Sequence, residues 1–232
     1  MDSNSSPKTS IAFVVIAHNE EAHIAKCLDS IINIAKNNCQ IIVVDSGSTD
    51  RTSMIIMNYS QKYSNLIFCR TDKKGPSAAR NIGLKNAKCE YTFFIDGDVK
   101  LEAGFIDHAL NEFQSHEQTC AIAGVLSDVV YNSTNDKIIA YIKDRYNRQV
   151  RKNVDRFGGI FIVRSSIACR VGLWDEMLFS HEDTDYAVRL KEFGNLVALP
   201  HKMGDHHTSL YEDRMLRMLR SGYFASYGIF MR

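Results

Sequence analysis

The chain has 232 residues, of which 45% are hydrophobic and 24% are charged, and its 28 lysines and arginines nearly balance its 27 aspartates and glutamates. This length suits one α/β domain with a full core. A net charge of +1 lacks the basic excess that is typical of nucleic-acid-binding proteins, so we expect no nucleic-acid partner.

The N-terminal residues and the cysteines indicate the cellular compartment of the protein. Residues 1–10 are polar and are expected to form a flexible leader rather than a signal peptide. The apolar run over 11–17 is too short to span a bilayer. The six cysteines form no CxxC pair, so zinc and thioredoxin-like sites have no support, and buried reduced thiols are expected. These features together predict a cytoplasmic protein.

The first half of the chain alternates strand and helix patterns. Four continuous apolar runs predict strands that are buried on both faces: 11–17, 40–45, 66–69 and 91–95. Helical patterns follow the first three of them: from residue 20, over 49–62 and over 75–87. This order predicts a mostly parallel, Rossmann-like sheet with helices on both faces. Ligands bind such sheets beyond the carboxyl ends of the strands.

The second half is less regular and shows no sharp domain boundary. Three further strands are expected: 119–126, 158–163 and 196–200. A short helix is expected after the acidic run at 181–185. Residues 131–157 are polar and are expected to form helix plus loop, and the charged, aromatic stretch within them, 137–157, is a candidate lid.

An acidic tripeptide, Asp96-Gly97-Asp98, ends the fourth predicted strand. Carboxylates at positions i and i+2 of a strand end point to the same side, and they repel each other unless a cation lies between them. Mg²⁺ or Mn²⁺ fits because these hard cations take oxygen ligands and keep positions for phosphate oxygens. A solvated turn is the alternative, and the tripeptide taken alone favours it.

Two further clusters lie in the second half. The acids of residues 181–185 (HEDTD) either cap a helix, because the helix dipole favours acids there, or supply the base that a hydroxyl acceptor needs. The histidines of residues 205–207 (DHH) either complete a metal shell or have a structural role.

Two polar stretches of the first half remain ambiguous. The turn over 45–50 (DSGSTD) suits contacts to a base or ribose, but the same residues also suit a turn followed by a helix cap. Basic side chains flank Gly75, namely Lys73, Lys74 and Arg80. They either neutralise a diphosphate or form a solvated basic face.

Four segments in order resemble glycosyltransferase family two, whose members have the GT-A fold. They are AHNEEAHIAKCLDSI from residue 17, VVDSGSTDRT from residue 43, GPSAARNIGLKNAKCEYTFFIDGDV from residue 75, and GGIFIVRSSIACRVGLWDEMLFSHEDTDYAVRLKEFG from residue 158, followed by DHHTS. The resemblance implies one GT-A domain over 11–210, with a nucleotide-binding half over 11–100 and an acceptor half over 101–210. It also implies inverting, metal-dependent transfer of a sugar from a nucleotide diphosphate to an acceptor hydroxyl.

The resemblance also implies residue roles. The nucleotide sugar would contact residues around the first strand ends: Ala17, His18, Glu20, Asp45, Lys74, Gly75, Arg80 and Asp96. A Mn²⁺ or Mg²⁺ ion would be held by Asp98 and by one of two neighbouring histidines, His206 and His207. Asp183 would be the catalytic base, and Glu182 would orient the acceptor or the sugar. The acceptor side would include Trp174 and His181.

The sequence departs from the family pattern at several positions. The resemblance implies uridine diphosphate as the preferred carrier, and Ser46 stands where the family frequently has the second acid of an Asp-Asp pair. His181 stands where glycine is common, and His18 where tyrosine is common. The acceptor is expected to be a glycan or a lipid-linked molecule of polysaccharide or glycolipid biosynthesis.

Two rival functions are less favoured. A sugar-phosphate nucleotidyltransferase usually has a glycine-rich loop directly after the first strand, where this chain has AHNEE. A non-catalytic nucleotide-sugar-binding module is opposed by the presence of both Asp98 and Asp183, although a fold alone does not establish a function.

The last segment, 211–232, mixes methionines, leucines and aromatic residues with interleaved arginines. A helix here would either pack on the catalytic domain or lie at an anionic membrane surface. The second alternative predicts a peripheral contact at the inner face of the membrane. The segment is too polar and too short to span a bilayer.

Overall fold

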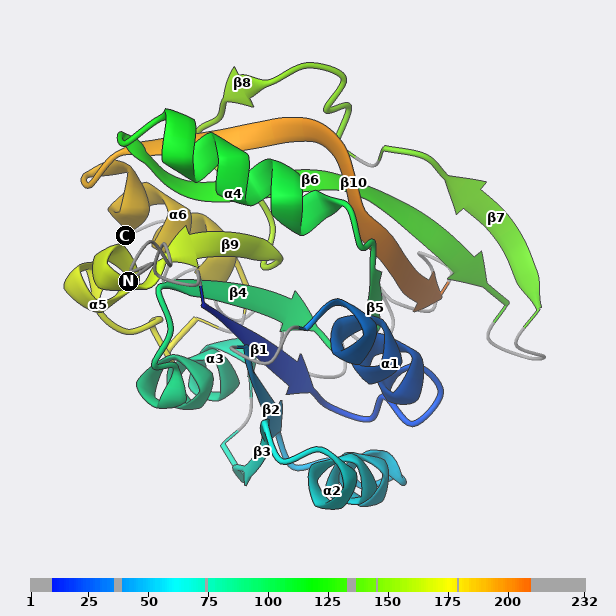
Figure 1. Cartoon of the computed structure of the whole chain (residues 1–232). Helices are drawn as coiled ribbons and strands as arrows, with labels where there is room; N and C mark the ends of the chain where they lie inside the picture. Colours follow the sequence, from blue (N-terminus) through cyan, green and yellow to red (C-terminus); the bar gives the residue numbers. More distant parts are fainter. Residues whose placement is uncertain are drawn as a thin grey trace, which may run out of the picture.

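The computed structural model describes residues 10–35, 39–73, 75–132, 137–144, 146–178 and 180–209. The predicted leader, except Ser10, and the predicted C-terminal helix lie outside these residues. The described part forms one ten-stranded sheet in the order β3-β2-β1-β4-β9-β6-β10-β5, and β7 and β8 pair with β6 and β10 (Figure 1).

The first half is a parallel β-α unit, as predicted. Strand β1 (Ile11–Ala17) lies between β2 (Gln40–Asp45) and β4 (Tyr91–Asp96), and β3 (Leu66–Arg70) pairs with β2, all in parallel. The connections contain three helices: α1 (Ile24–Ile34), α2 (Thr52–Lys62) and α3 (Pro76–Asn86). The apolar runs are continuous because helices cover both faces of these strands.

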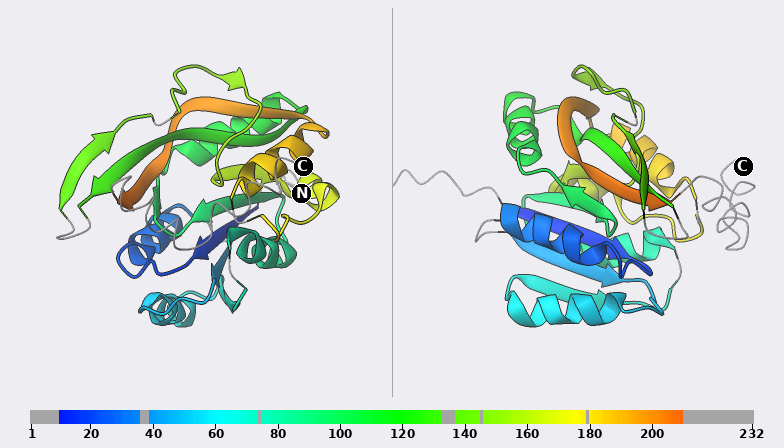
Figure 2. Two further views of the ribbon diagram at one scale, coloured as in Figure 1. Left: turned by 180° about the vertical axis from the view of Figure 1, so that it is seen from behind. Right: turned by 90° about the vertical axis from the view of Figure 1, so that its right-hand side faces the viewer.

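Successive residues of β1 enter two different apolar cores. Phe13 and Val15 pack on the face covered by α1, α2 and α4 (Phe105–Ser115). Ala12 and Val14 pack on the opposite face, beneath α3, α5 (Ser165–Val171) and α6 (Glu182–Lys191). The sheet therefore has helices on both faces, as Figure 2 shows from two directions.

The second half continues the same sheet. Strand β9 (Phe161–Arg164) is antiparallel to both β4 and β6 (Thr119–Tyr131), so it joins the two halves. Strand β10 (Asn195–Ser209) runs parallel to β6 and antiparallel to the short β5 (Val99–Leu101). No described helix has the length and apolar character needed to cross a membrane.

One predicted region is wrong in its secondary structure. Helix plus loop was expected over 131–157, but the described residues of this region contain two strands, β7 (Ile138–Ile142) and β8 (Lys152–Asn153). Strand β7 pairs with β6 at the sheet edge, and all five of its residues are exposed. Its isoleucines and tyrosine favour a strand, but without a buried face the alternation of polar and apolar residues is missing.

Helix α3 lies unusually close to β1 because Gly83 faces the strand. A Cβ atom at Gly83 would lie 2.1 Å from Cγ1 of Val14, a fully buried residue. A methyl group therefore cannot enter this contact without moving the helix away from the sheet. The close packing matters for the site because α3 also carries Arg80.

We predict that Gly83→Ala lowers the free energy of unfolding by about 1–3 kcal/mol, the usual cost of overpacking a core. Urea-induced unfolding measures the change. Gly104→Ala is the control, because a methyl group at Gly104 meets no atom within 4 Å, and it should change stability by less than about 1 kcal/mol. Equal stabilities of the two variants would contradict the packing assigned to α3.

Candidate active site

The site lies where the connections of the parallel sheet diverge. From β1 the chain moves to β2 on one side, whereas β4 lies on the other side, and Ile16 near the end of β1 is paired with Asp96. In open α/β sheets this point, outside the carboxyl ends of the strands, is where ligands bind. The first acidic motif therefore lies where the sequence predicted it.

A cavity of about 170 Å³ brings the separate sequence clusters together. Asp96 comes from the first acidic motif, Asp183 from the second, and His206 from the histidine cluster. The remaining lining residues come from the second half of the chain: Leu126, Tyr146, Arg148, Gly158, Gly159, Ile160 and Met203. The cavity thus joins the end of β4, the start of α6 and the bend of β10.

His206 lies between two carboxylates. Its Nδ1 donates a hydrogen bond to Oδ1 of Asp128 at 2.7 Å, and its Nε2 lies 3.2 Å from Oδ2 of Asp98. A neutral imidazole that donates from Nδ1 would keep the lone pair of Nε2 available for a metal ion beside Asp98. This is the arrangement in which a carboxylate orients a metal-binding histidine.

His207 has a different environment. Its Nδ1 is joined by a hydrogen bond of 2.8 Å to the hydroxyl of Tyr131, and its ring stacks on His23. Burial, followed by the nearby His23, lowers the pKa of His207 to about 4. Of the two histidines that the sequence offered as metal ligands, the structure therefore places His206 beside Asp98.

Glu20 lies against the acidic motif. Burial, followed by the charges of Asp98 and Asp96, raises the pKa of Glu20 to about 8. The family resemblance placed this residue in the nucleotide-sugar site, and in the structure the charges of the two aspartates act on its carboxyl group. Three acidic side chains near one another repel, and a cation between them would relieve this repulsion.

The donor set suits a divalent cation that is shared with a substrate. Among the described residues no group of three or more histidine, cysteine or acidic side chains forms a complete metal cage. However, Oδ1 of Asp98 is buried and has no hydrogen-bond partner. A carboxylate oxygen with His206 beside it fits Mn²⁺ or Mg²⁺, because such ions commonly bind through one or two protein ligands plus substrate phosphates.

Arg80 connects the two acidic clusters. Its side chain is 3% exposed; Nη2 lies 3.0 Å from Oδ1 of Asp96, and Nη1 lies 2.8 Å from Oε1 of Glu182. Burial raises the pKa of each carboxyl group, and the guanidinium opposes this shift. A Cβ atom at Gly159 would lie 2.1 Å from Nη2, so only glycine leaves room for Arg80. The guanidinium was expected near a diphosphate, but it is engaged by protein carboxylates.

The structure corrects the expected place of Trp174. We expected it beside the acceptor pocket, but it is 2% exposed and belongs to the apolar core beneath α6. Its ring stacks on Tyr186 with centroids 4.0 Å apart, and the guanidinium of Arg80 lies 4.7 Å from its centroid. Trp174 therefore supports Arg80 from the core instead of lining the cavity.

Asp183 lies in the first turn of α6 and presents one oxygen to the cavity side. Its Oδ1 accepts a hydrogen bond of 2.7 Å from the backbone N–H of Thr184. Its Oδ2 would lie 3.9 Å from a Cβ atom at Gly158, which lines the cavity. His181 precedes this turn with φ of 63°, a left-handed conformation that glycine adopts most easily. This explains why glycine is common at that position.

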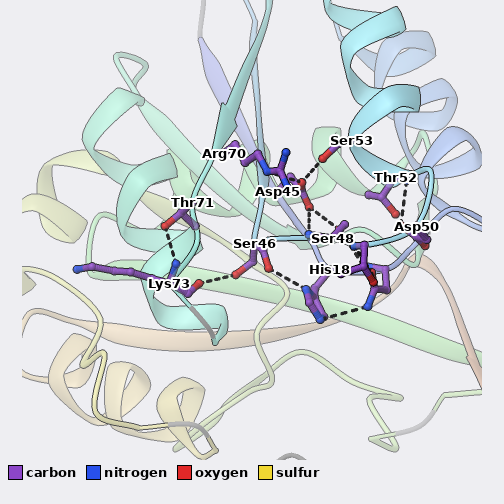
Figure 3. A network of polar contacts seen from close by, with 12 residues as sticks. His18, Asp45, Ser46, Ser48, Asp50, Thr52, Ser53, Arg70, Thr71 and Lys73 are labelled. Carbon is purple, nitrogen blue, oxygen red and sulfur yellow. Dashed lines mark hydrogen bonds and ion pairs between the residues drawn. The ribbon is translucent and has the colours of Figure 1, made fainter.

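The turn after β2 is held by Asp45 (Figure 3). Asp45 is 0% exposed; it accepts hydrogen bonds from the N–H and hydroxyl of Ser48 and from the hydroxyl of Ser53, and Arg70 lies 3.7 Å from it. Both of its oxygens therefore have partners within the protein. A contact between Asp45 and a nucleotide base remains a prediction.

Other residues predicted for the nucleotide side lie around the same turn. The hydroxyl of Ser46 donates to the carbonyl oxygen of Lys73, a bond that an aspartate at this position could not make (Figure 3). His18 is exposed and its Nδ1 lies 2.7 Å from the carbonyl oxygen of Ser46, next to Ala17 at the end of β1. Gly75 takes φ of 98° at the start of α3. Lys74 lies outside the described residues.

Sequence reasoning missed three residues of the site. Asp128 is a single acid within an apolar strand, and such an acid usually has a buried partner, so this signal was available. Tyr146 and Arg148 line the cavity from the stretch that was marked as a candidate lid. No local pattern distinguishes these two from solvent-exposed loop residues.

The fold is also found in known proteins. The chain is similar to a crystal structure of S. aureus TarS in complex with UDP, with a TM-score of 0.68 and 19% identity over 91% of this chain and 64% of that one. It is similar to GalNAc-T7 with UDP, GalNAc and Mn²⁺, with a TM-score of 0.70 and 14% identity over 88% of this chain and 44% of that one. These likenesses define the class: the protein has the GT-A fold.

Sequence comparison gives the family. The model of glycosyl transferase family 2 matches residues 12–177, so the chain belongs to this family. The glycosyltransferase GlyA of Streptococcus pneumoniae is 30% identical over 152 residues, which are 65% of this chain but 21% of GlyA. The chain thus spans about a fifth of this relative.

We predict that Arg80→Met lowers the free energy of unfolding by about 3 kcal/mol, because it leaves the largely buried Glu182 and the partly exposed Asp96 without their partner. The double variant Arg80→Met/Glu182→Gln should recover part of this loss, since one uncompensated charge is gone. Arg51→Met is the control, because Arg51 forms an exposed pair with Glu21, and it should cost less than about 1 kcal/mol. Urea-induced unfolding compares them, and a double variant no more stable than Arg80→Met would contradict the assigned charge network.

Proposed function

We propose that the protein transfers a sugar from a nucleoside diphosphate, with uridine diphosphate preferred, to an acceptor hydroxyl with inversion. One observation carries the proposal: a single cavity is lined by Asp96, by the candidate cation ligand His206 and by the candidate base Asp183. A transferase of this kind needs both a group that stabilises the leaving diphosphate and a group that takes the acceptor proton.

The donor assignment rests on the sheet and on the compared structures. The nucleotide would lie beyond the ends of β1 and β2, next to the turn that Asp45 holds. The TarS and GalNAc-T7 structures both contain UDP, which supports this carrier for the present chain.

Asp98 and His206 would hold Mn²⁺ or Mg²⁺. Such an ion would supply Lewis-acid stabilisation of the charge that grows on the leaving diphosphate. Asp128 would keep the imidazole of His206 in the orientation and tautomer that this ligand role needs, through the bond at its Nδ1. The Mn²⁺ of the GalNAc-T7 structure supports the choice of metal.

Asp183 would act as the base. Its Oδ2 is directed to the cavity side while Oδ1 is held by the backbone, so the side chain is already oriented. The acceptor oxygen would attack the anomeric carbon from the face opposite the leaving group, which inverts that centre. Glu182 pairs with Arg80, which fixes the start of α6, and its expected role of orienting the acceptor or the sugar stays a prediction. The acceptor would be a glycan or a lipid-linked molecule.

We predict that Asp183→Asn lowers turnover by roughly two to four decades while UDP affinity stays nearly unchanged, because only the base is lost. The measurement is UDP release from a panel of UDP-sugars with mixed glycan acceptors. Asp185→Asn is the matched control, since Asp185 belongs to the same helix but pairs with Arg189 away from the cavity. An equal fall in UDP affinity and turnover would make Asp183 a binding residue instead.

We also predict that UDP raises the melting temperature of the wild-type protein more with Mn²⁺ than with EDTA, because a ligand of the native state stabilises it by mass action. Asp98→Ala should remove the Mn²⁺-dependent part of the increase, whereas Asp107→Ala, an exposed acid of α4, should retain it. If Asp98→Ala shows the same Mn²⁺-dependent increase in melting temperature as the wild type, the assignment of Asp98 as a metal ligand is wrong.

A further inference from the structure

Arg148 places a buried positive charge in the wall of the cavity. Its side chain lines the cavity although the residue is only 4% exposed. Nη1 donates a hydrogen bond to the carbonyl oxygen of Gly124, and the guanidinium lies 4.5 Å from the ring centroid of Tyr146. Both partners are uncharged, and within the described part of the chain Arg148 forms no ion pair.

The nearest acid in the sequence forms no ion pair with this guanidinium. Asp144 accepts hydrogen bonds from the backbone N–H of Arg148 and from the side chain of Gln149, so it shapes the loop. Burial lowers the pKa of Arg148, and Tyr146 and Asp144 oppose this shift in part; an arginine keeps its charge at neutral pH. A buried charge without a partner is costly, which makes a ligand the natural source of the missing negative charge.

The position of the loop indicates which substrate carries that charge. Arg148 and Tyr146 belong to the segment between β7 and β8, in the second half of the chain. A Cβ atom at Gly158 would lie 3.0 Å from Oη of Tyr146 and 3.9 Å from Oδ2 of Asp183, so the loop reaches the candidate base. The turn held by Asp45 contributes no residue to the described lining of the cavity.

We propose that Arg148 binds an oxyanion of the acceptor, so that the acceptor carries a phosphate or a carboxylate near the hydroxyl that receives the sugar. This inference rests on the proposed function because it takes Asp183 as the acceptor-side base. The planar guanidinium matches both anions, since each offers two oxygens to its parallel N–H groups. Gly124 and Tyr146 hold the guanidinium in place before the anion arrives.

The test is a calorimetric titration of the wild-type protein saturated with UDP and Mn²⁺, so that the diphosphate position is already filled. The probes are glycerol 3-phosphate, glucuronate and, as the neutral control, glycerol. We expect one or both anions to bind and glycerol not to bind. Binding of glycerol 3-phosphate alone assigns a phosphate, and binding of glucuronate alone assigns a carboxylate.

Variants test whether Arg148 is responsible. Arg148→Gln should weaken anion binding by about tenfold or more, as the loss of a hydrogen bond to a charged group predicts, and Arg148→Lys should weaken it less. Arg156→Gln is the matched control, since Arg156 is an exposed arginine outside the cavity, and it should bind like the wild type. The wild-type titration does not depend on the folding of any variant.

Three results would overturn the inference: no anion-specific binding to the UDP-saturated wild type, equal binding by Arg148→Gln, or anion binding that appears only when the titration is repeated without UDP. The last result would assign Arg148 to the diphosphate. UDP binding and UDP release from UDP-sugars are measured on the same samples. If these persist while anion binding is absent, the inference fails and the proposed function stands; if UDP itself does not bind, the proposed function fails.

Discussion

The paired contacts of Arg80 hold the site together. One guanidinium from α3 contacts Asp96 at the end of β4 and Glu182 at the start of α6, so it fixes the first half of the chain against the second. A guanidinium that is 3% exposed needs carboxylate partners, and the largely buried Glu182 and the partly exposed Asp96 supply them. Trp174 beneath the guanidinium and the missing side chain at Gly159 make this pairing possible. The distance between the candidate cation ligands and the candidate base therefore depends on Arg80.

Some charged side chains around the cavity have partners of opposite charge within the described part of the chain, and others do not. Arg80 pairs with Asp96 and Glu182, whereas Glu20 lies close to Asp98; burial first, and then the charges of Asp98 and Asp96, raise the pKa of Glu20 to about 8. On the other side Arg148 forms no ion pair with any described residue. Under the proposals made above, the first region would attract a cation with its diphosphate, and the second would attract an anion. This polarity would orient two substrates in one cavity before any reaction begins.

The sequence predicted the parallel half well because its strands are buried on both faces and so are apolar without interruption. Asp98 and Asp183 stand out in the sequence because one follows an apolar strand and the other begins a helix, and their roles stay predictions. Strand β7 was missed because its residues are exposed on both faces. The places of Trp174 and Arg148 depend on contacts between distant segments, which leave no local pattern.

The residues on the two sides of the cavity belong to different kinds of secondary structure. Asp96 and His206 belong to β4 and β10, strands of the central sheet, where neighbouring strands limit their movement. Tyr146 and Arg148 belong to a loop between two short, exposed strands. Loops tolerate sequence change better than the elements they connect. The chemistry of transfer would therefore be fixed by the sheet, while the choice of acceptor could change through this loop without disturbing the charge network around Arg80.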